Sequence, residues 1–568
     1  MMKCYLWRLA LLVSCAVVVL PAQAAGQSEP PRLIVQITVD ALRGDLPSRY
    51  LSEMGPGGFR YLMEKGVHYT NAHYQHANTE TIVGHASLAT GSVPAAHGMI
   101  GNVWFDRALD RTVYNIEDPD YMLLTAGASV DSATEIDPTQ RAAKVEGRSP
   151  RAILSSTFGD ELSVATQGRA KVFGVSVKDR GAVAMAGHSG KAFWFSKATG
   201  EFVTSSYYYD RYPNWVEAYN AVGPTQQYAD ASWTLLQDQS DYLFGARDDQ
   251  KFETDFPGFG RTFPHAYGAA DDKYFTTRLT LSPAGDQMTL DFAKALISAE
   301  NLGQDAVPDY LSVSFSSNDY VNHLFGPSSL EAEDNLLHLD RTLAELFAYI
   351  DKTVGLKRTL IVLSADHGSP ETPGFLNEMG FSLSRYFDAP ALDDSPLVQA
   401  LKARFGIDGV LIESYNHPYL YLNDQAIEEA ELDRAEVEQA TAEIVSAVDG
   451  IAVAVSSTAL RQGQLPNDRL TAAIRANFHN KRSGDVYIVF EPGVFINDFD
   501  GLIVASTHGS PWRYDTFVPV IFAGAGIKGQ QLSRPITPYD IAPTLSALVG
   551  AAPPSATVGE PLVEIVDR

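Results

Sequence analysis

Short runs of aliphatic and β-branched residues alternate with amphipathic segments along most of this chain. Each run is long enough for one buried strand, and the segments between them repeat apolar residues at helical spacing. The expected strands are residues 33–39, 171–177, 310–315, 359–363, 485–490 and 518–522, and the expected helices include 82–88, 330–346 and 428–448. This alternation predicts an α/β fold with a doubly wound central sheet and helices on both of its faces.

Two stretches interrupt the alternation. Residues 196–280 are rich in aromatic residues, glycine and proline, and residues 380–500 separate the fourth expected strand from the last one. The sequence contains no linker-like or low-complexity tract and no internal repeat that would divide it further. We therefore expect one catalytic domain over residues 30–568, with inserted cap regions at about 196–280 and 380–500.

The first 24 residues have the pattern of an export signal. Lys3 and Arg8 form a basic end, residues 9–20 an apolar segment, and residues 22–24 (Ala-Gln-Ala) a cleavage site. The apolar segment is short for a membrane anchor, and lipoprotein attachment at Cys15 is an alternative interpretation. We expect cleavage after Ala24 and a periplasmic or secreted protein without a transmembrane segment.

Composition narrows the class of protein further. Both cysteines, Cys4 and Cys15, lie in the predicted signal, so the mature chain has no disulfide and depends on its apolar core. Sulfatases that convert a cysteine to formylglycine are excluded for the same reason. The signal contains two basic residues and no acidic one, so cleavage changes the formal net charge from −26 to −28. A surface this acidic argues against nucleic acid or anionic membranes as partners.

Polar residues follow the expected strands at the points where these end. Asp366 and His367 follow residues 359–363, and Asp40 follows residues 33–39. Ligands in open α/β sheets bind at the carboxyl ends of strands, and carboxylate beside imidazole suits a divalent ion such as zinc. By itself, Asp40 is better explained as a helix N-cap and the Asp366-His367 pair as a surface turn, and the metal interpretation gains weight only when the residues are taken together.

Three further residues offer metal ligands. Asp319 and His323 are four positions apart, so both project from the same face of a helical turn. The alternative interpretation is a hydrogen-bonded pair on a helix. His508 adds an imidazole on a glycine-bounded loop, where a single histidine is usually structural. We interpret His85 and His97 as structural, because each is tied to a glycine and neither follows a strand.

Other residues offer phosphate chemistry. Thr81 stands where the N-cap of helix 82–88 is expected, at the positive end of the helix dipole, where free N–H groups bind anions. Its hydroxyl either caps the helix or, beside a metal, attacks phosphorus. Lys178 and Arg180 follow residues 171–177; they either flank a solvated turn or contact phosphoryl oxygens through an ammonium and a bidentate guanidinium.

The order Asp40, Thr81, Asp319-x-x-x-His323, Asp366-His367, His508 resembles the alkaline phosphatase superfamily, and the resemblance runs from about Leu33 to the C-terminal ITPYDIAPTL. It is closest to bacterial periplasmic monoesterases with a threonine nucleophile, the PafA and PhoK type. Counting back along the sequence from Thr90-Gly91, the resemblance selects Thr81 over Thr79 as the nucleophile. Asn102, with Lys178 and Arg180, matches the residues that contact phosphoryl oxygens in these enzymes, whereas Asn322 stands where glycine is expected.

The resemblance implies two zinc ions, one held by Asp40, Asp366, His367 and the Thr81 oxygen and the other by Asp319, His323 and His508. It implies an alkaline phosphatase that attacks small-molecule phosphate monoesters in line through a phosphothreonine intermediate, and we expect a monomer. The formal charge of such a site is positive and matches a monoester dianion better than a diester monoanion. Manganese or cobalt could replace zinc in vitro. The alternatives are a phosphodiesterase or nucleotide pyrophosphatase on the same fold, and a non-catalytic phosphate-binding protein.

Overall fold

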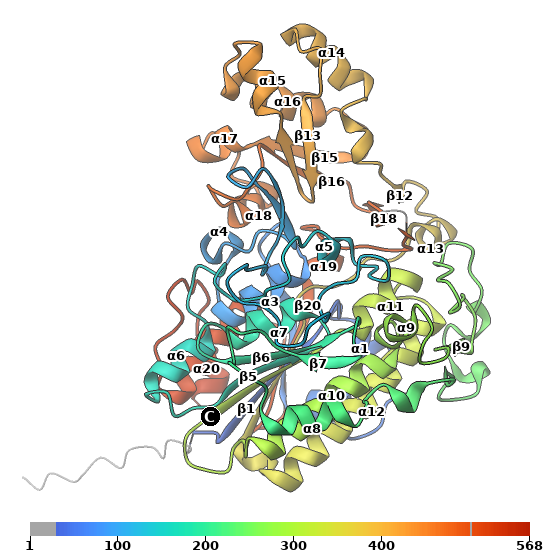
Figure 1. Cartoon of the computed structure of the whole chain (residues 1–568), viewed down its shortest axis with the longest axis vertical. Coiled ribbons are helices and arrows are strands. Elements are labelled where there is room, and N and C mark those ends of the chain that lie inside the picture. Colours follow the sequence, from blue (N-terminus) through green and yellow to red (C-terminus); the bar gives the residue numbers. More distant parts are fainter. Residues whose placement is uncertain (1–29, 500–501, 568) are drawn as a thin grey trace, which may run out of the picture.

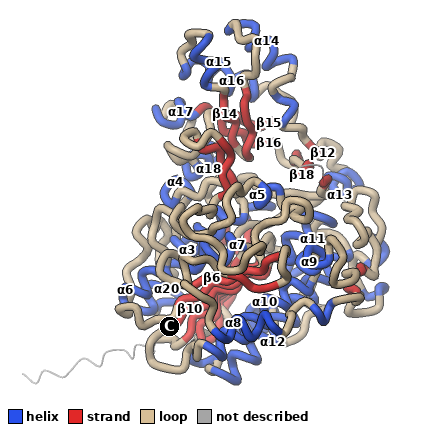
Figure 2. The backbone as a smooth tube through the Cα atoms, viewed as in Figure 1, coloured by secondary structure: helices blue, strands red, loops and turns tan. Residues whose placement is uncertain are grey.

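A nine-stranded mixed sheet occupies the centre of the molecule (Figures 1 and 2). The structure is a computed structural model that describes residues 30–499 and 502–567, so the predicted signal at residues 1–24 lies outside the described residues. The order of the strands is β21-β2-β20-β11-β1-β10-β5-β6-β7. In chain order they are β1 (Leu33–Val39), β2 (Val67–His73), β5 (Val172–Ser176), β6 (Lys191–Ser196), β7 (Glu201–Val203), β10 (Asp309–Phe315), β11 (Thr359–Ser364), β20 (Phe517–Gly524) and β21 (Gln530–Leu532).

Four neighbouring strands, β11, β1, β10 and β5, run parallel in the middle of this sheet. Val39 at the end of β1 pairs with Phe315 of β10, and Thr38 pairs with Ser364 of β11. The strands therefore end at one edge, and the residues that follow them meet there although they are far apart in the sequence.

Helices cover both faces of the sheet (Figure 1). Leu33, Val35 and Ile37 of β1 belong to one apolar cluster with α10 (Pro283–Ala299) and α12 (Leu330–Thr353). Ile34, on the opposite face, belongs to a second cluster with α6 (Phe158–Ala165) and α20 (Ile541–Val549). This division follows from the alternation of side chains along a strand. The predicted doubly wound α/β fold is confirmed. None of the described helices is long and apolar enough to cross a membrane.

A smaller lobe, residues 385–495, stands at one end of the molecule (Figure 1, orange). It has a four-stranded sheet of order β13-β14-β16-β15 and its own apolar cluster. Its elements are β12 (Arg385–Tyr386), α14 (Pro396–Phe405), β13 (Ile412–Asn416), β14 (Tyr419–Leu422), α15 (Asp424–Glu429), α16 (Arg434–Val445), β15 (Ile451–Ser456), α17 (Ser457–Gln462), α18 (Arg469–Asn477), β16 (Val486–Phe490) and β17 (Val494–Phe495). The expected strand at 485–490 thus pairs with β14 and β15, and assigning it to the alternation of the main body was wrong.

Two helices differ from expectation for local reasons. The expected helix 428–448 is divided into α15 and α16, because the Asp433 side chain caps the second helix by accepting the N–H of Glu436. Helix α3 (Thr81–Thr90) begins at Thr81 and has Glu80 at its N-cap position. The expectation that Thr81 is the N-cap residue is therefore wrong by one position, and its hydroxyl does not cap the helix.

The remaining elements are short. They are α1 (Leu46–Arg49), α2 (Phe59–Lys65), α4 (Pro94–His97), β3 (Val103–Asp106), β4 (Arg111–Tyr114), α5 (Pro138–Arg141), α7 (Asp179–Ala186), α8 (Asn214–Ala221), β8 (Ser232–Trp233), β9 (His265–Ala266), α9 (Phe275–Thr280), α11 (Ser317–Phe325), α13 (Pro373–Glu378), β18 (Asp498–Phe499), β19 (Leu502–Ile503), α19 (Arg513–Thr516) and α21 (Val563–Val566).

Candidate active site

Two groups of acidic and histidine side chains lie at the carboxyl edge of the central sheet. The first cluster comprises Asp40, which follows β1, and Asp366 and His367, which follow β11; the second cluster comprises Asp319 and His323 of α11 together with His508. Within each cluster the possible ligand atoms all lie within 4.8 Å of one another. The structure thus brings together the six residues that the sequence analysis placed in the same two groups.

Backbone carbonyl groups orient the histidine rings of both clusters. The Nδ1 atom of His367 donates to the Gly368 carbonyl at 2.9 Å, and those of His323 and His508 donate to the Ser506 and Thr79 carbonyls at 2.8 Å. Each ring therefore turns its Nε2 atom toward a carboxylate of its own cluster, at 3.4 Å in all three cases, as metal-binding histidines do.

Several ligand atoms of the clusters are buried without a hydrogen-bond partner, among them Asp40 Oδ1, Asp319 Oδ1, Asp366 Oδ2 and His367 Nε2. Yet His367 Nε2 lies only 3.4 Å from Asp40 Oδ1 and 3.5 Å from Asp366 Oδ2. Burial lowers the pKa of His367, but Asp366 and Asp40 raise it to about 10, because the carboxylates favour a positive charge between them. Orphaned buried polar atoms that face one another need a common partner, and a divalent cation fits each cluster.

The two clusters are neighbours. Lys178 Nζ lies 2.7 Å from Asp40 Oδ2 and 2.5 Å from Asp319 Oδ2, so one ammonium group contacts a carboxylate of each cluster. The rings of His367 and His508 stack with their centroids 3.6 Å apart. Burial lowers the pKa of Lys178, but Asp319 and Asp40 raise it above its usual value, so this side chain is charged at neutral pH.

Helix α3 brings the Thr81 hydroxyl to the same edge of the sheet. Gly84 lies against the backbone of Asp366, where an added Cβ atom would stand 2.0 Å from the Asp366 carbonyl oxygen, so only glycine permits this approach. His85 Nδ1 lies 3.1 Å from Asp366 Oδ2, a contact with the first cluster that the sequence analysis did not foresee. Thr81 is 1% exposed, and its Oγ1 accepts a hydrogen bond of 3.3 Å from Arg180 Nη2.

Helix α11 also supports the segment that follows β1. Asn318 donates to the Asp40 carbonyl at 2.9 Å, and Asn322 donates to the Ala41 carbonyl at 3.4 Å. Asn322, the residue found where the resemblance leads us to expect glycine, therefore holds the backbone beside the first cluster.

An ion pair with Asp137 fixes the guanidinium of Arg180. Arg180 Nη1 lies 2.7 Å from Asp137 Oδ2, and Asp137 also caps α5 by accepting the N–H groups of Thr139 and Gln140. Burial raises the pKa of Asp137, but Arg180 lowers it below its usual value. The Asp-Pro pair at 137–138 signals a helix start, but nothing in the sequence connects it with Arg180, so the sequence analysis missed this contact.

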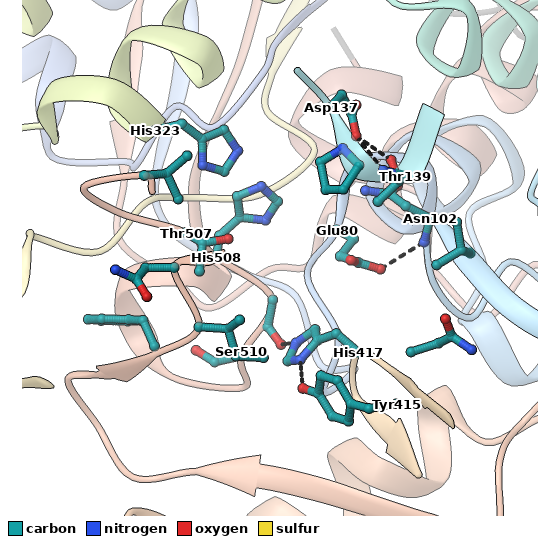
Figure 3. A pocket seen from close by; sticks show the side chains of 18 of the residues that line it. Glu80, Asn102, Asp137, Thr139, His323, Tyr415, His417, Thr507, His508 and Ser510 are labelled. Carbon is teal, nitrogen blue, oxygen red and sulfur yellow. Dashed lines mark hydrogen bonds between the residues drawn. The ribbon is translucent and has the colours of Figure 1, made fainter. Parts of the chain in front are cut away.

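Part of this site borders a cavity of about 920 Å³ (Figure 3). Its lining includes Asn102, Asp137, Arg180 and all three residues of the second cluster. Asn102 Oδ1 accepts the N–H of Ile82 at the start of α3. The smaller lobe contributes another part of the lining, which includes Tyr386, Phe387, Tyr415, His417 and Phe490.

Removing the charge of Asp137 should disturb Arg180 without removing the cap of α5, because asparagine is also a good N-cap residue. We expect Asp137→Asn to lower kcat/KM for a phosphate monoester by about tenfold to a hundredfold, since a guanidinium that is no longer fixed aligns its ligand poorly. Steady-state kinetics measure the change. Asp120→Asn, which affects an exposed ion pair with Arg151, is the control and should leave kcat/KM unchanged. Parental kinetics for Asp137→Asn would contradict a positioning role.

The fold and the paired clusters define a metal-dependent hydrolase of the alkaline phosphatase superfamily. A model of the type I phosphodiesterase / nucleotide pyrophosphatase family matches residues 34–511, and the chain belongs to this family. It is 34% identical to alkaline phosphatase PhoV of Synechococcus elongatus over 539 residues, which cover 94% of this chain and 93% of PhoV. It is 32% identical to alkaline phosphatase PafA of Elizabethkingia meningoseptica over 99% of both chains.

Solved structures agree with this assignment. The crystal structure of PafA matches with a TM-score of 0.85 at 32% identity, over 94% of this chain and 99% of that one. Murine ectonucleotide pyrophosphatase / phosphodiesterase 5 matches with a TM-score of 0.50 at 14% identity, which shows a shared fold only. Together with the near-complete coverage by curated alkaline phosphatases, these matches identify the chain as a phosphatase enzyme.

Proposed function

We propose that this chain is an exported phosphate monoester hydrolase, an alkaline phosphatase, in which Thr81 attacks phosphorus and forms a phosphothreonine intermediate beside two zinc ions. The main support is the position of the Thr81 hydroxyl at the start of α3, 3.3 Å from the buried Arg180 guanidinium and on a helix that touches Asp366. A hydroxyl beside a cationic fork, at the start of a helix that contacts a candidate cation site, supports attack on a phosphoryl group.

The donor set suits zinc, because it combines three imidazole nitrogens with three carboxylates. Asp40, Asp366, His367 and the Thr81 oxygen would hold one ion, and Asp319, His323 and His508 the other. Such a pair of ions stabilises negative charge on the attacking and the departing oxygens of an in-line displacement.

The protein's own groups recognise the phosphoryl group. Asp137 engages Nη1 of Arg180 and leaves Nη2 beside Thr81, so the guanidinium points its remaining donors toward the nucleophile. The carbonyl oxygen of the Asn102 side chain is occupied by the Ile82 N–H, which leaves its amide NH2 group as a donor for a ligand in the cavity.

A phosphodiesterase or nucleotide pyrophosphatase is the second candidate, because the matching family model has that description. The two buried cations favour the monoester. Lys178 is 1% exposed and Arg180 is 3% exposed, so both charges act in a site largely removed from water. A monoester dianion gains from both, whereas a diester has one charge fewer and must fit a second substituent beside them.

Kinetics of the zinc-loaded mature protein with matched aryl phosphate monoesters and diesters test the proposal. Both substrates should carry the same leaving group, so that a difference in kcat/KM does not arise from the leaving group. We expect kcat/KM to be higher for the monoester by at least about a hundredfold, because the diester uses the cationic groups poorly. A preference for the diester would establish the second candidate, and no turnover of either ester would favour a phosphate-binding protein.

A further inference from the structure

Residues 505–510, the segment that contains His508, form hydrogen bonds with the smaller lobe before and after His508. The hydroxyl of Tyr386, on β12, donates to the Ala505 carbonyl at 2.8 Å. His417, between β13 and β14, has its Nε2 atom 2.8 Å from the Gly509 carbonyl oxygen. In Figure 3 the His417 ring lies between Tyr415 and the segment that contains His508 and Ser510.

The hydrogen bonds of His417 fix its tautomer and its orientation. A carbonyl oxygen only accepts, so Nε2 must carry the proton that is donated to Gly509. The Nδ1 atom then accepts from the hydroxyl of Tyr415, which lies 2.7 Å away. The ring is also stacked on Phe490, with the planes inclined by 8° and the centroids 6.2 Å apart. The imidazole therefore has a hydrogen-bond partner at each ring nitrogen and a fixed orientation.

The backbone at Gly509 is shaped to receive this ring. Gly509 has φ of +116°, a conformation that residues with a Cβ atom rarely adopt. A Cβ atom at this position would also lie 2.6 Å from His417 Nε2. The lobe and the segment thus meet in direct contact one residue after His508.

The main body provides the other supports of this segment. The His323 carbonyl accepts the N–H groups of Ala505 and Ser506, and the Thr79 carbonyl accepts from His508 Nδ1. On the C-terminal side, Asp515 accepts the N–H of Ser510. The carbonyl of Gly509 lies between these supports and is engaged by His417.

From these contacts we infer that His417 is a positioning residue for His508, so that the smaller lobe completes the second cation site. The inference rests on the proposed function, because it treats His508 as a cation ligand. Loss of His417 releases the Gly509 carbonyl and allows the segment to shift, which moves His508 Nε2 relative to Asp319 and His323. Among the described residues the first cluster has no hydrogen bond with His417 and meets His508 only through the stacked ring of His367, so the effect falls mainly on the second ion.

Chelator competition with the zinc-loaded full-length mature protein tests the inference, with zinc per chain measured by elemental analysis. We expect His417→Ala to lose one zinc equivalent at a chelator concentration about tenfold lower than the parent, as for other residues that orient metal ligands, while the other equivalent shifts much less. His417→Gln should restore part of the affinity, because its amide N–H can donate to Gly509. His479→Ala, another histidine of the smaller lobe, is the matched control and should match the parent.

A second variant keeps the inference testable even if His417→Ala does not fold. Tyr386→Phe deletes one hydroxyl and keeps the ring, and it should weaken the same zinc equivalent less than His417→Ala does. Parental zinc release in these variants, or equal weakening of both equivalents, overturns the inference and leaves the ester kinetics of the proposed function untouched. A parent protein that binds no zinc overturns both proposals.

Discussion

Thr81→Ala is expected to lower kcat/KM for phosphate monoesters by more than about a thousandfold, as removal of a nucleophile does in enzymes with covalent intermediates. The fold should survive, because the hydroxyl of Thr81 is not the cap of α3 and its hydrogen-bond donor in the structure is Arg180. Steady-state kinetics with circular dichroism separate loss of activity from loss of structure. Thr81→Ser should retain much more activity than Thr81→Ala, since it keeps a hydroxyl at the same place.

The matched control is Thr90→Ala at the other end of the same helix. The Thr90 hydroxyl donates to the Ala86 carbonyl and lies away from both clusters, so its loss should leave kcat/KM within a few-fold of the parent. Undiminished activity of Thr81→Ala would remove the phosphothreonine mechanism. Tight phosphate binding without turnover in the parent protein would support the non-catalytic alternative.

Arg180→Ala is expected to lower kcat/KM much more for phosphate monoesters than for phosphate diesters. Its kcat/KM for an aryl monoester should fall by about a hundredfold to a thousandfold, because a desolvated bidentate donor to the phosphoryl oxygens is lost. For the diester with the same leaving group the loss should be about tenfold or less, since this substrate has fewer charged oxygens to engage. The measurement is the ratio of the two kcat/KM values in parent and variant.

Arg180 is a better choice than Lys178 for this comparison. Lys178 contacts both Asp40 and Asp319, so its removal would also leave two buried carboxylates without their counter-charge. Arg151→Ala, which alters an exposed arginine, is the control and should leave the ratio unchanged. Equal losses for the two esters in Arg180→Ala would contradict recognition of a monoester dianion.

Five of the six cluster residues follow strands of the central sheet, directly or on the next helix, whereas His508 lies on a loop and is assigned only through the family resemblance. Asp40 and Asp366 come immediately after or close to the ends of β1 and β11, and parallel strands in register deliver such residues to one edge. Asp319 and His323 share a helix face that begins after β10, so their proximity is also local. Short-range rules therefore indicate the candidate ligands on distant segments, and the family resemblance sorts them into two sites.

Other features depend on tertiary contacts that no local pattern encodes. Asp137 meets Arg180 across 43 positions of the chain, and His417 meets Gly509 across 92. Strand β2 escaped prediction because its sequence, VHYTNAH, is half polar, yet it lies between β20 and β21 in the central sheet. Residues 486–490 have the apolar pattern of a central strand, but the smaller lobe provides a second core in which the same pattern is equally stable.

Diffraction from crystals of the zinc-loaded protein, recorded at the zinc absorption edge, tests the central claim most directly. The account predicts two anomalous peaks about 4 Å apart. One peak should lie among Asp40, Asp366 and His367 with the Thr81 oxygen beside it, and the other among Asp319, His323 and His508. A single peak, a peak outside these clusters, or a Thr81 hydroxyl turned away from the first ion would contradict the account.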